Sequence, residues 1–188
     1  KCRFILIRTL RERKRMKILV TGNYEPDYNR TVILLEGLRK KGIELIEYRY
    51  QKFNKAILQE KSKEADLVFI PSFLYKNVKE VKRVVKIPVL FDPLISIYMT
   101  KVFDKKTVWK YSPRALKNYW KDYSAFHSAD ILFADTQAHK NYFVKTFKVA
   151  EEKKSIVKFK VADAANMEEF SNDFFDYSLY FQQVLNFI

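Results

Sequence analysis

The stretch MKILVTG at residues 16–22 is a short, mostly apolar run that ends in glycine. Strands with one solvated face alternate apolar and polar residues, whereas strands buried on both faces read as continuous apolar runs. The stretch therefore predicts a buried strand of a parallel sheet. Downstream, Val32, Leu35 and Leu38 follow helical spacing, and Gly42 stands where a glycine commonly ends a helix. A strand followed by a helix is the first part of a βαβ unit.

The same alternation continues along the chain. Further apolar runs predict strands at residues 43–48, 66–71, 87–91, 129–135 and 156–161. Helical spacing or capping residues predict helices at residues 54–64, around 78–85, and at 94–102, 112–128 and 136–147. The alternation predicts an α/β fold: a single Rossmann-like domain with a doubly wound, mostly parallel sheet and helices on both faces.

The 188 residues carry a net charge of +14, and the charge is unevenly distributed. Residues 1–15 hold seven Lys or Arg against one Glu, and we interpret them as a basic segment that is disordered or lies upstream of the natural start. The predicted domain covers residues 16–161. Residues 162–188 form a tail whose apolar stretch, residues 174–181, we interpret as the truncated start of a second domain or as a terminal helix.

Composition excludes several kinds of site. With 3 Gly, the chain contains neither the dinucleotide fingerprint nor the P-loop. One Cys excludes a Cys-based zinc site, and the two His lack metal-type spacing, so we predict no metal and no cofactor. No apolar run approaches the roughly 20 residues that span a bilayer. We expect a cytoplasmic protein, with peripheral contact to the inner membrane face left open.

Ligands of open α/β sheets bind beyond the carboxyl ends of the strands. This rule selects the candidate substrate-binding residues Gly22, Asn23, Tyr24, Asn29, Arg30, Ser96, Tyr98, Asp135 and Thr136. Gly22 permits close backbone approach, and Arg30 can clamp a phosphate or carboxylate. Asp92 is the candidate catalytic residue, a general base, with a helix N-cap as an equally weighted alternative. Ser72 and Tyr75 follow the third strand at the same edge.

Three stretches resemble a known family. Residues 16–22 look like the opening of a GT-B glycosyltransferase. The stretch PVLFDPLISIY at residues 88–98 and the stretch SADILFADT at residues 128–136 resemble segments of bacterial group 1, family 4-like glycosyltransferases. The resemblance covers residues 16–161, which correspond to the amino-terminal, acceptor-side domain of such enzymes.

The resemblance implies that Gly22, Asn23, Asn29 and Arg30 line a cleft between two domains, with Asp135 and Thr136 on its wall. It places Asp92 where many relatives carry an acceptor-side His or Asp. The implied reaction is hexosyl transfer from a nucleotide sugar to a saccharide or lipid-linked acceptor. The donor binds the second domain, so we expect this chain to be inactive alone. The sequence departs from the family in lacking paired glycines after the first strand and a glycine near residue 162.

The alternative function is that of a non-catalytic α/β domain that binds nucleic acid or an anionic surface. Its basis is the positive charge and the aromatic residues interleaved with Lys, as in the stretch WKY at residues 109–111. Nucleic acid is disfavoured because no RNA-recognition, zinc-finger or helix-turn-helix signature accompanies them. An anionic membrane surface is a further candidate partner.

Overall fold

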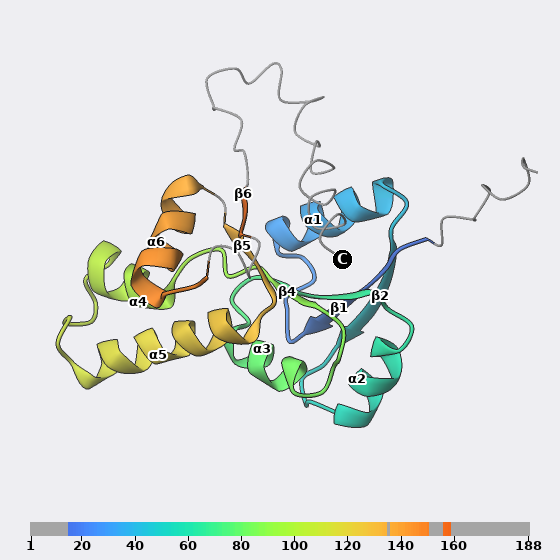
Figure 1. Ribbon diagram of the computed structural model, residues 1–188, viewed down its shortest axis with the longest axis horizontal. Helices are drawn as coiled ribbons and strands as arrows, with labels where there is room; N and C mark the ends of the chain where they lie inside the picture. Colours follow the sequence, from blue (N-terminus) through green and yellow to red (C-terminus); the bar gives the residue numbers. More distant parts are fainter. Residues whose placement is uncertain (1–14, 135, 151–155, 159–188) are drawn as a thin grey trace, which may run out of the picture.

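A parallel sheet forms the centre of the molecule (Figure 1). The computed structural model describes residues 15–134 and 136–150, together with the backbone of residues 156–158. The strands run in the order β2-β1-β3-β4-β5-β6, and all five neighbouring pairs are parallel. They are β1 (Lys17–Gly22), β2 (Glu44–Arg49), β3 (Leu67–Ile70), β4 (Val89–Phe91), β5 (Ile131–Ala134) and β6 (Ile156–Lys158). The predicted α/β class and Rossmann-like parallel sheet are confirmed.

Several of the helices begin at residues whose side chains cap them. The helices are α1 (Asn29–Lys40), α2 (Lys55–Ser62), α3 (Tyr75–Lys82), α4 (Ile97–Met99), a π-helix η1 (Thr100–Asp104), α5 (Pro113–Ser128) and α6 (Gln137–Phe147). The side chains of Asn54, Ser112 and Thr136 accept backbone N–H bonds in the first turns of α2, α5 and α6. These three caps stand at the first residues of the helices predicted at residues 54–64, 112–128 and 136–147, so the starts of those helices are confirmed.

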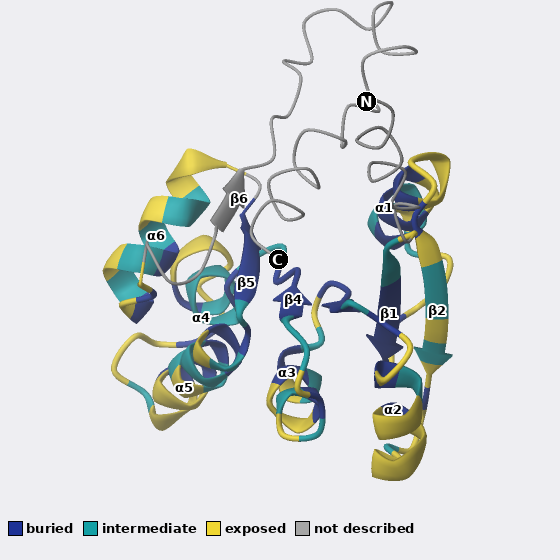
Figure 2. Cartoon of the chain, turned by 45° about the vertical axis from the view of Figure 1, so that its right-hand side comes forward, coloured by how far each residue is buried: buried dark blue, intermediate teal, exposed yellow. Residues whose placement is uncertain are grey.

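Alternate residues of the strands supply two cores, one on each face of the sheet. Val68 and Ile70 of β3 pack in the core that holds buried residues of α2, α3, α5 and α6. Leu67 and Phe69 of the same strand belong to the other core, which holds Leu34, Leu35 and Leu38 of α1. In Figure 2, β1, β4 and β5 have the colour of buried residues, whereas β2 at the edge of the sheet is partly exposed. Helices on both faces confirm the doubly wound arrangement.

The strand order changes direction between β1 and β3. The chain moves from β1 outward to β2 and then returns across β1 to form β3 on its other side. The register places the ends of β1, β3 and β4 along one edge, since Val20 lies beside Phe69 and Ile70 beside Phe91. In open α/β sheets a crevice forms at such a switch point, at the carboxyl ends of the strands.

The segment after β4 differs from the predicted helix at residues 94–102. Leu94 has a φ of 61°, which no α-helix accommodates, and the helix begins only at Ile97 with Ser96 as its N-cap. From Thr100 the chain continues as the π-helix η1. The alternative interpretation of Asp92 as a helix N-cap is therefore wrong. Its side chain instead accepts a bond from the N–H of Leu94 within a tight turn.

A candidate ligand site at the carboxyl edge of the sheet

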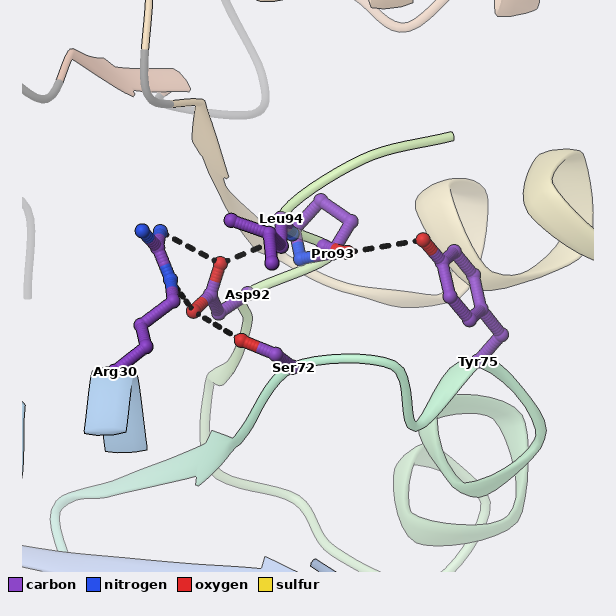
Figure 3. Close-up of polar contacts among 6 residues, drawn as sticks. All are labelled: Arg30, Ser72, Tyr75, Asp92, Pro93 and Leu94. Atoms are coloured by element: carbon purple, nitrogen blue, oxygen red, sulfur yellow. Dashed lines mark hydrogen bonds and ion pairs between the residues drawn. The ribbon is translucent and has the colours of Figure 1, made fainter. Parts of the chain in front are cut away.

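An ion pair between Arg30 and Asp92 lies at the carboxyl edge of the sheet (Figure 3). Arg30 comes from the first turn of α1, and Asp92 directly follows β4. The guanidinium donates from Nε to Oδ2 at 2.6 Å and from Nη2 to Oδ1 at 3.0 Å. Ser72, in the loop after β3, donates its hydroxyl to Oδ2 at 2.8 Å. The two-pronged geometry fixes the guanidinium plane as well as its position.

The burial of this ion pair carries a large desolvation cost for the Asp92 carboxylate. The Asp92 side chain is fully buried, and the Arg30 side chain is 18% exposed. A buried carboxylate is very costly unless charged or hydrogen-bonding partners compensate it. Asp92 receives four hydrogen bonds: two from Arg30, one from Ser72 and one from the N–H of Leu94. To act as a base toward a ligand, the carboxylate must exchange at least one of these bonds.

Two bulky residues with positive φ flank the ion pair. Phe73, next to Ser72, has a φ of 69°, and Leu94, two residues after Asp92, has a φ of 61°. Side chains other than Gly, Asn and Asp rarely adopt this conformation, which costs on the order of 1–2 kcal/mol per residue. Such strain persists only where the surroundings enforce it, and it clusters at ligand-binding sites. The turns that carry Ser72 and Asp92 are thus held in unusual conformations.

The predicted residues that follow β1 divide into two groups. Gly22 has a φ of 130°, and the side chain of Leu74 fills the space beside its α-carbon. Tyr24 is buried and donates its hydroxyl to Oε2 of Glu47 at 2.9 Å, and burial raises its pKa. Gly22 and Tyr24 therefore serve the packing of this region. Asn23 and Asn29 are exposed at the edge of the sheet and remain candidate ligand contacts.

Ser96 and Tyr98 lie in a different cluster from Asp92. The Ser96 hydroxyl donates to Oδ2 of Asp122 at 2.7 Å, and the N–H of Tyr98 donates to the same oxygen at 2.8 Å. The Tyr98 ring packs edge-on against Phe103 and Tyr119. The structure therefore does not bring these two candidates to the Arg30–Asp92 pair.

The remaining predicted residues follow β5. Thr136 is exposed, and its hydroxyl accepts the N–H of His139 at 3.1 Å as the N-cap of α6. Asp135 lies outside the described residues, as do the predicted tail at residues 162–188 and most of the basic segment at residues 1–15. Of the ten predicted site residues, Arg30 and Asp92 are the two that the described hydrogen bonds join directly.

Two buried polar residues were not among the predicted site residues. Ser72 was noted only as one of several residues after the third strand, and it donates directly to Asp92. Asp122 is fully buried on α5, and burial raises its pKa to about 6. A signal for Asp122 exists in the sequence, because it shares a helix face with Ala115, Asn118 and Ala125. An acid on an otherwise buried helix face indicates a specific polar partner.

Two further observations concern metal binding and membrane crossing in the described part of the chain. Within residues 15–134 and 136–150, no three His, Cys, Asp or Glu side chains lie close enough to hold one metal ion. In that same part of the chain, no helix combines the length and the apolar character needed to cross a bilayer.

The fold and this site define a class of protein. The chain is a Rossmann-like α/β domain with a buried polar cluster at the carboxyl edge of its sheet. No protein-family model matches the sequence, and no curated protein is significantly similar to it. The glycosyltransferase resemblance therefore stands on the three quoted stretches alone.

Proposed function

We propose that this chain is the acceptor-side domain of a two-domain glycosyltransferase. In this proposal it binds a saccharide or lipid-linked acceptor at the carboxyl edge of the sheet, and a second domain holds the nucleotide-sugar donor. The observation that carries the proposal is the Arg30–Asp92–Ser72 cluster beside the switch point between β1 and β3. Open α/β sheets bind their ligands at that location.

Two further features support this assignment. The stretch at residues 88–98 contains β4 and Asp92, and the stretch at residues 128–136 contains β5, so both family-like segments run to the same edge of the sheet. The strained turns at Phe73 and Leu94 flank the polar cluster there. Strain of this kind is typical of ligand-binding loops.

The ion pair suggests distinct roles for its two members. Arg30 is held at the edge of the sheet by Asp92, and a guanidinium can bind phosphate or a sugar hydroxyl through its N–H donors. Asp92 is the candidate base that removes the proton from the acceptor hydroxyl as that oxygen bonds to the anomeric carbon and the nucleoside diphosphate leaves. Because Asp92 is buried beneath Arg30, that step requires Arg30 to shift toward the ligand.

The proposal is tested by titrating the ¹⁵N-labelled chain with glucose 1-phosphate, a sugar phosphate standing in for the acceptor, and with UDP-glucose. We expect glucose 1-phosphate to shift the amide signals of Asn23, Asn29 and Arg30. Arg30→Lys should weaken binding about tenfold, because Lys cannot donate the two parallel bonds. The matched control is Arg39→Lys in the last turn of α1, where the guanidinium pairs with Glu47 on the surface.

Two results would contradict the proposal. If UDP-glucose binds this edge more tightly than glucose 1-phosphate does, the domain is a donor site and the acceptor-side assignment is wrong. If neither compound shifts these amides at millimolar concentration, the Arg30–Asp92 pair is a structural ion pair and the edge is not a sugar site.

A further inference from the structure

Most of the exposed large apolar side chains of the described residues lie in one part of the molecule. Seven are exposed in the described residues, and five of these lie between residues 103 and 120. They are Phe103 (45% exposed), Trp109 (70%), Tyr111 (73%), Leu116 (58%) and Trp120 (55%). Both tryptophans of the chain are among them. We refer to these five residues as the aromatic face.

A depression of about 550 Å³ lies among these side chains. Tyr111 and Leu116 line it directly, together with Tyr98 and Tyr119. The remaining three residues contact those lining rings, with ring centroids 5.7 Å apart for Phe103 and Tyr98, 5.5 Å for Trp109 and Tyr111, and 5.7 Å for Trp120 and Tyr119. The aromatic face is therefore one continuous surface.

The aromatic face lies apart from the core and from the Arg30–Asp92 site. It is built from η1, the following loop and the first half of α5, and that loop forms the left-hand extremity of the molecule in Figure 1. The opposite side of α5, with Ala115, Asn118 and Asp122, packs into the protein. Packing of the described domain leaves the aromatic face uncovered, which is unusual for side chains of this size.

Positive charge accompanies the aromatic face. Between residues 100 and 122 the chain has seven Lys or Arg and two Asp, and one of these, Asp122, is fully buried. The exposed cations are Lys105, Lys106, Lys110, Arg114 and Lys117. On α5, Lys117 follows Leu116 directly and lies one turn before Trp120 and Lys121, so apolar and basic side chains run side by side along the helix.

We propose that the aromatic face docks on the surface of an anionic lipid bilayer. Trp and Tyr prefer the headgroup level, where the ring lies among apolar groups and its polar atom reaches water. Lys and Arg extend from the same level to lipid phosphates, and each adds about fivefold to the affinity for an anionic surface. The inference is independent of the proposed sugar transfer, because it rests on a different surface.

A lipid surface fits these side chains better than a nucleic acid does. Stacked bases need open ring faces. Here one face of the Tyr111 ring is covered by Nζ of Lys110, which lies 5.4 Å from the ring centroid. Leu116, in the middle of the surface, contributes apolar area but offers no ring for stacking. Shallow insertion into a bilayer uses apolar area of any shape.

The chain carries its own probe for this test, because its two tryptophans both belong to the aromatic face. We expect a blue shift of the intrinsic emission on adding vesicles of 70% phosphatidylcholine and 30% phosphatidylglycerol, and co-flotation of the chain with them. Pure phosphatidylcholine vesicles should produce little of either effect. Raising the salt from 0.05 to 0.5 M should weaken the binding, because ions screen the exposed charges.

Substitutions on the aromatic face and on α2 test which surface binds the vesicles. Lys110→Gln with Lys117→Gln keeps both tryptophans and should weaken binding about 25-fold. Lys55→Gln with Lys63→Gln removes the same charge from α2 and its C-terminus, and is the matched control. Trp109→Ser with Trp120→Ser should abolish flotation, whereas Ile57→Ser, at an exposed apolar residue of α2, should not. All these positions are exposed, so circular dichroism should show unchanged folding.

Three outcomes would overturn the proposal. Flotation without an emission shift would mean that another face binds lipid. Equal loss of binding in the α2 control variants would mean that net charge, not this surface, is responsible. An emission shift with a single-stranded oligonucleotide that anionic vesicles do not compete away would identify a nucleic-acid surface instead.

Discussion

The side chain of Leu74 occupies the space into which a Cβ atom on Gly22 would point. Gly22 ends β1, and Leu74 immediately precedes α3, so the contact joins the edge of the sheet to the loop that carries Ser72. Gly22 also has a φ of 130°, in a region that side chains other than glycine avoid. Close approach and backbone conformation therefore both require glycine at this position.

We expect Gly22→Ala to lower the free energy of unfolding by at least about 2 kcal/mol, from backbone strain and overpacking together. Gly42→Ala is the control, because Gly42 has a φ of 76° but open space around it, so the cost there is about 1 kcal/mol of strain. Urea unfolding measures both. The explanation fails if the cost of Gly22→Ala is as large in a Leu74→Ala background as in the wild type.

Arg30→Ala should destabilise the chain by about 3–5 kcal/mol, because it leaves the buried Asp92 carboxylate without its countercharge. Arg39→Ala, in a surface pair with Glu47, should cost no more than about 1 kcal/mol. Chemical denaturation compares the two. The double change Arg30→Ala with Asp92→Ala should cost less than the sum of the single changes, and full additivity would contradict a direct coupling.

Asp122 predicts a specific dependence of stability on pH. Burial raises its pKa from 3.8 to about 6, so between these values the folded chain binds more protons at this site than the unfolded chain does. The stability contribution of this carboxyl is thus complete below pH 3.8 and is lost as the pH rises through about 6, by about 3 kcal/mol at most. Asp122→Asn, neutral at every pH, should lack this loss.

The measurement for Asp122 is the difference in unfolding free energy between wild type and Asp122→Asn at several pH values from 4 to 7.5. The variant should gain on the wild type as the pH rises through this window. A flat difference, or one of opposite sign, would mean that the folded protein does not raise the pKa of Asp122.

Ser112→Ala should cost about 1 kcal/mol, because its hydroxyl caps α5 by accepting the N–H of Ala115 at 3.2 Å. Ser128→Ala is the control within the same helix: its hydroxyl donates to the carbonyl of Ser124 and caps nothing, so removal should be nearly neutral. Hydrogen exchange of the first-turn amides reports the local effect. Equal protection in both variants would contradict the capping role.

Much of the fold could be predicted because its signals are local. Strands buried on both faces read as apolar runs, and the caps at Asn54, Ser112 and Thr136 act within three residues of the helix that they begin. The segment after β4 was harder, because the left-handed turn at Leu94 and the π-helix η1 leave no periodic trace in the sequence. The helix predicted at residues 94–102 therefore begins three residues later than expected, at Ile97, and continues as the π-helix η1.

The candidate site was less predictable because its contacts are distant in sequence. Arg30 and Asp92 are 62 residues apart, and their meeting depends on the strand order, which apolar patterns do not specify. The sequence could place both residues at the carboxyl edge but could not pair them. For the same reason, the sequence could not show that Ser96 and Tyr98 lie apart from Asp92. Their hydrogen-bond partner is Asp122, which lies on α5.

The parallel sheet also affects how the chain acquires its structure. No pair of neighbouring strands can form by closing a tight turn, because parallel strands need a crossover of a dozen or more residues. The β1–β3 pair joins residues 49 positions apart, at Ile18 and Leu67. Loop closure must precede every such pairing, so we expect folding on the slower side for a domain of this size. Strand β1, which lies between β2 and β3, is synthesised before either of these neighbours and must wait for both.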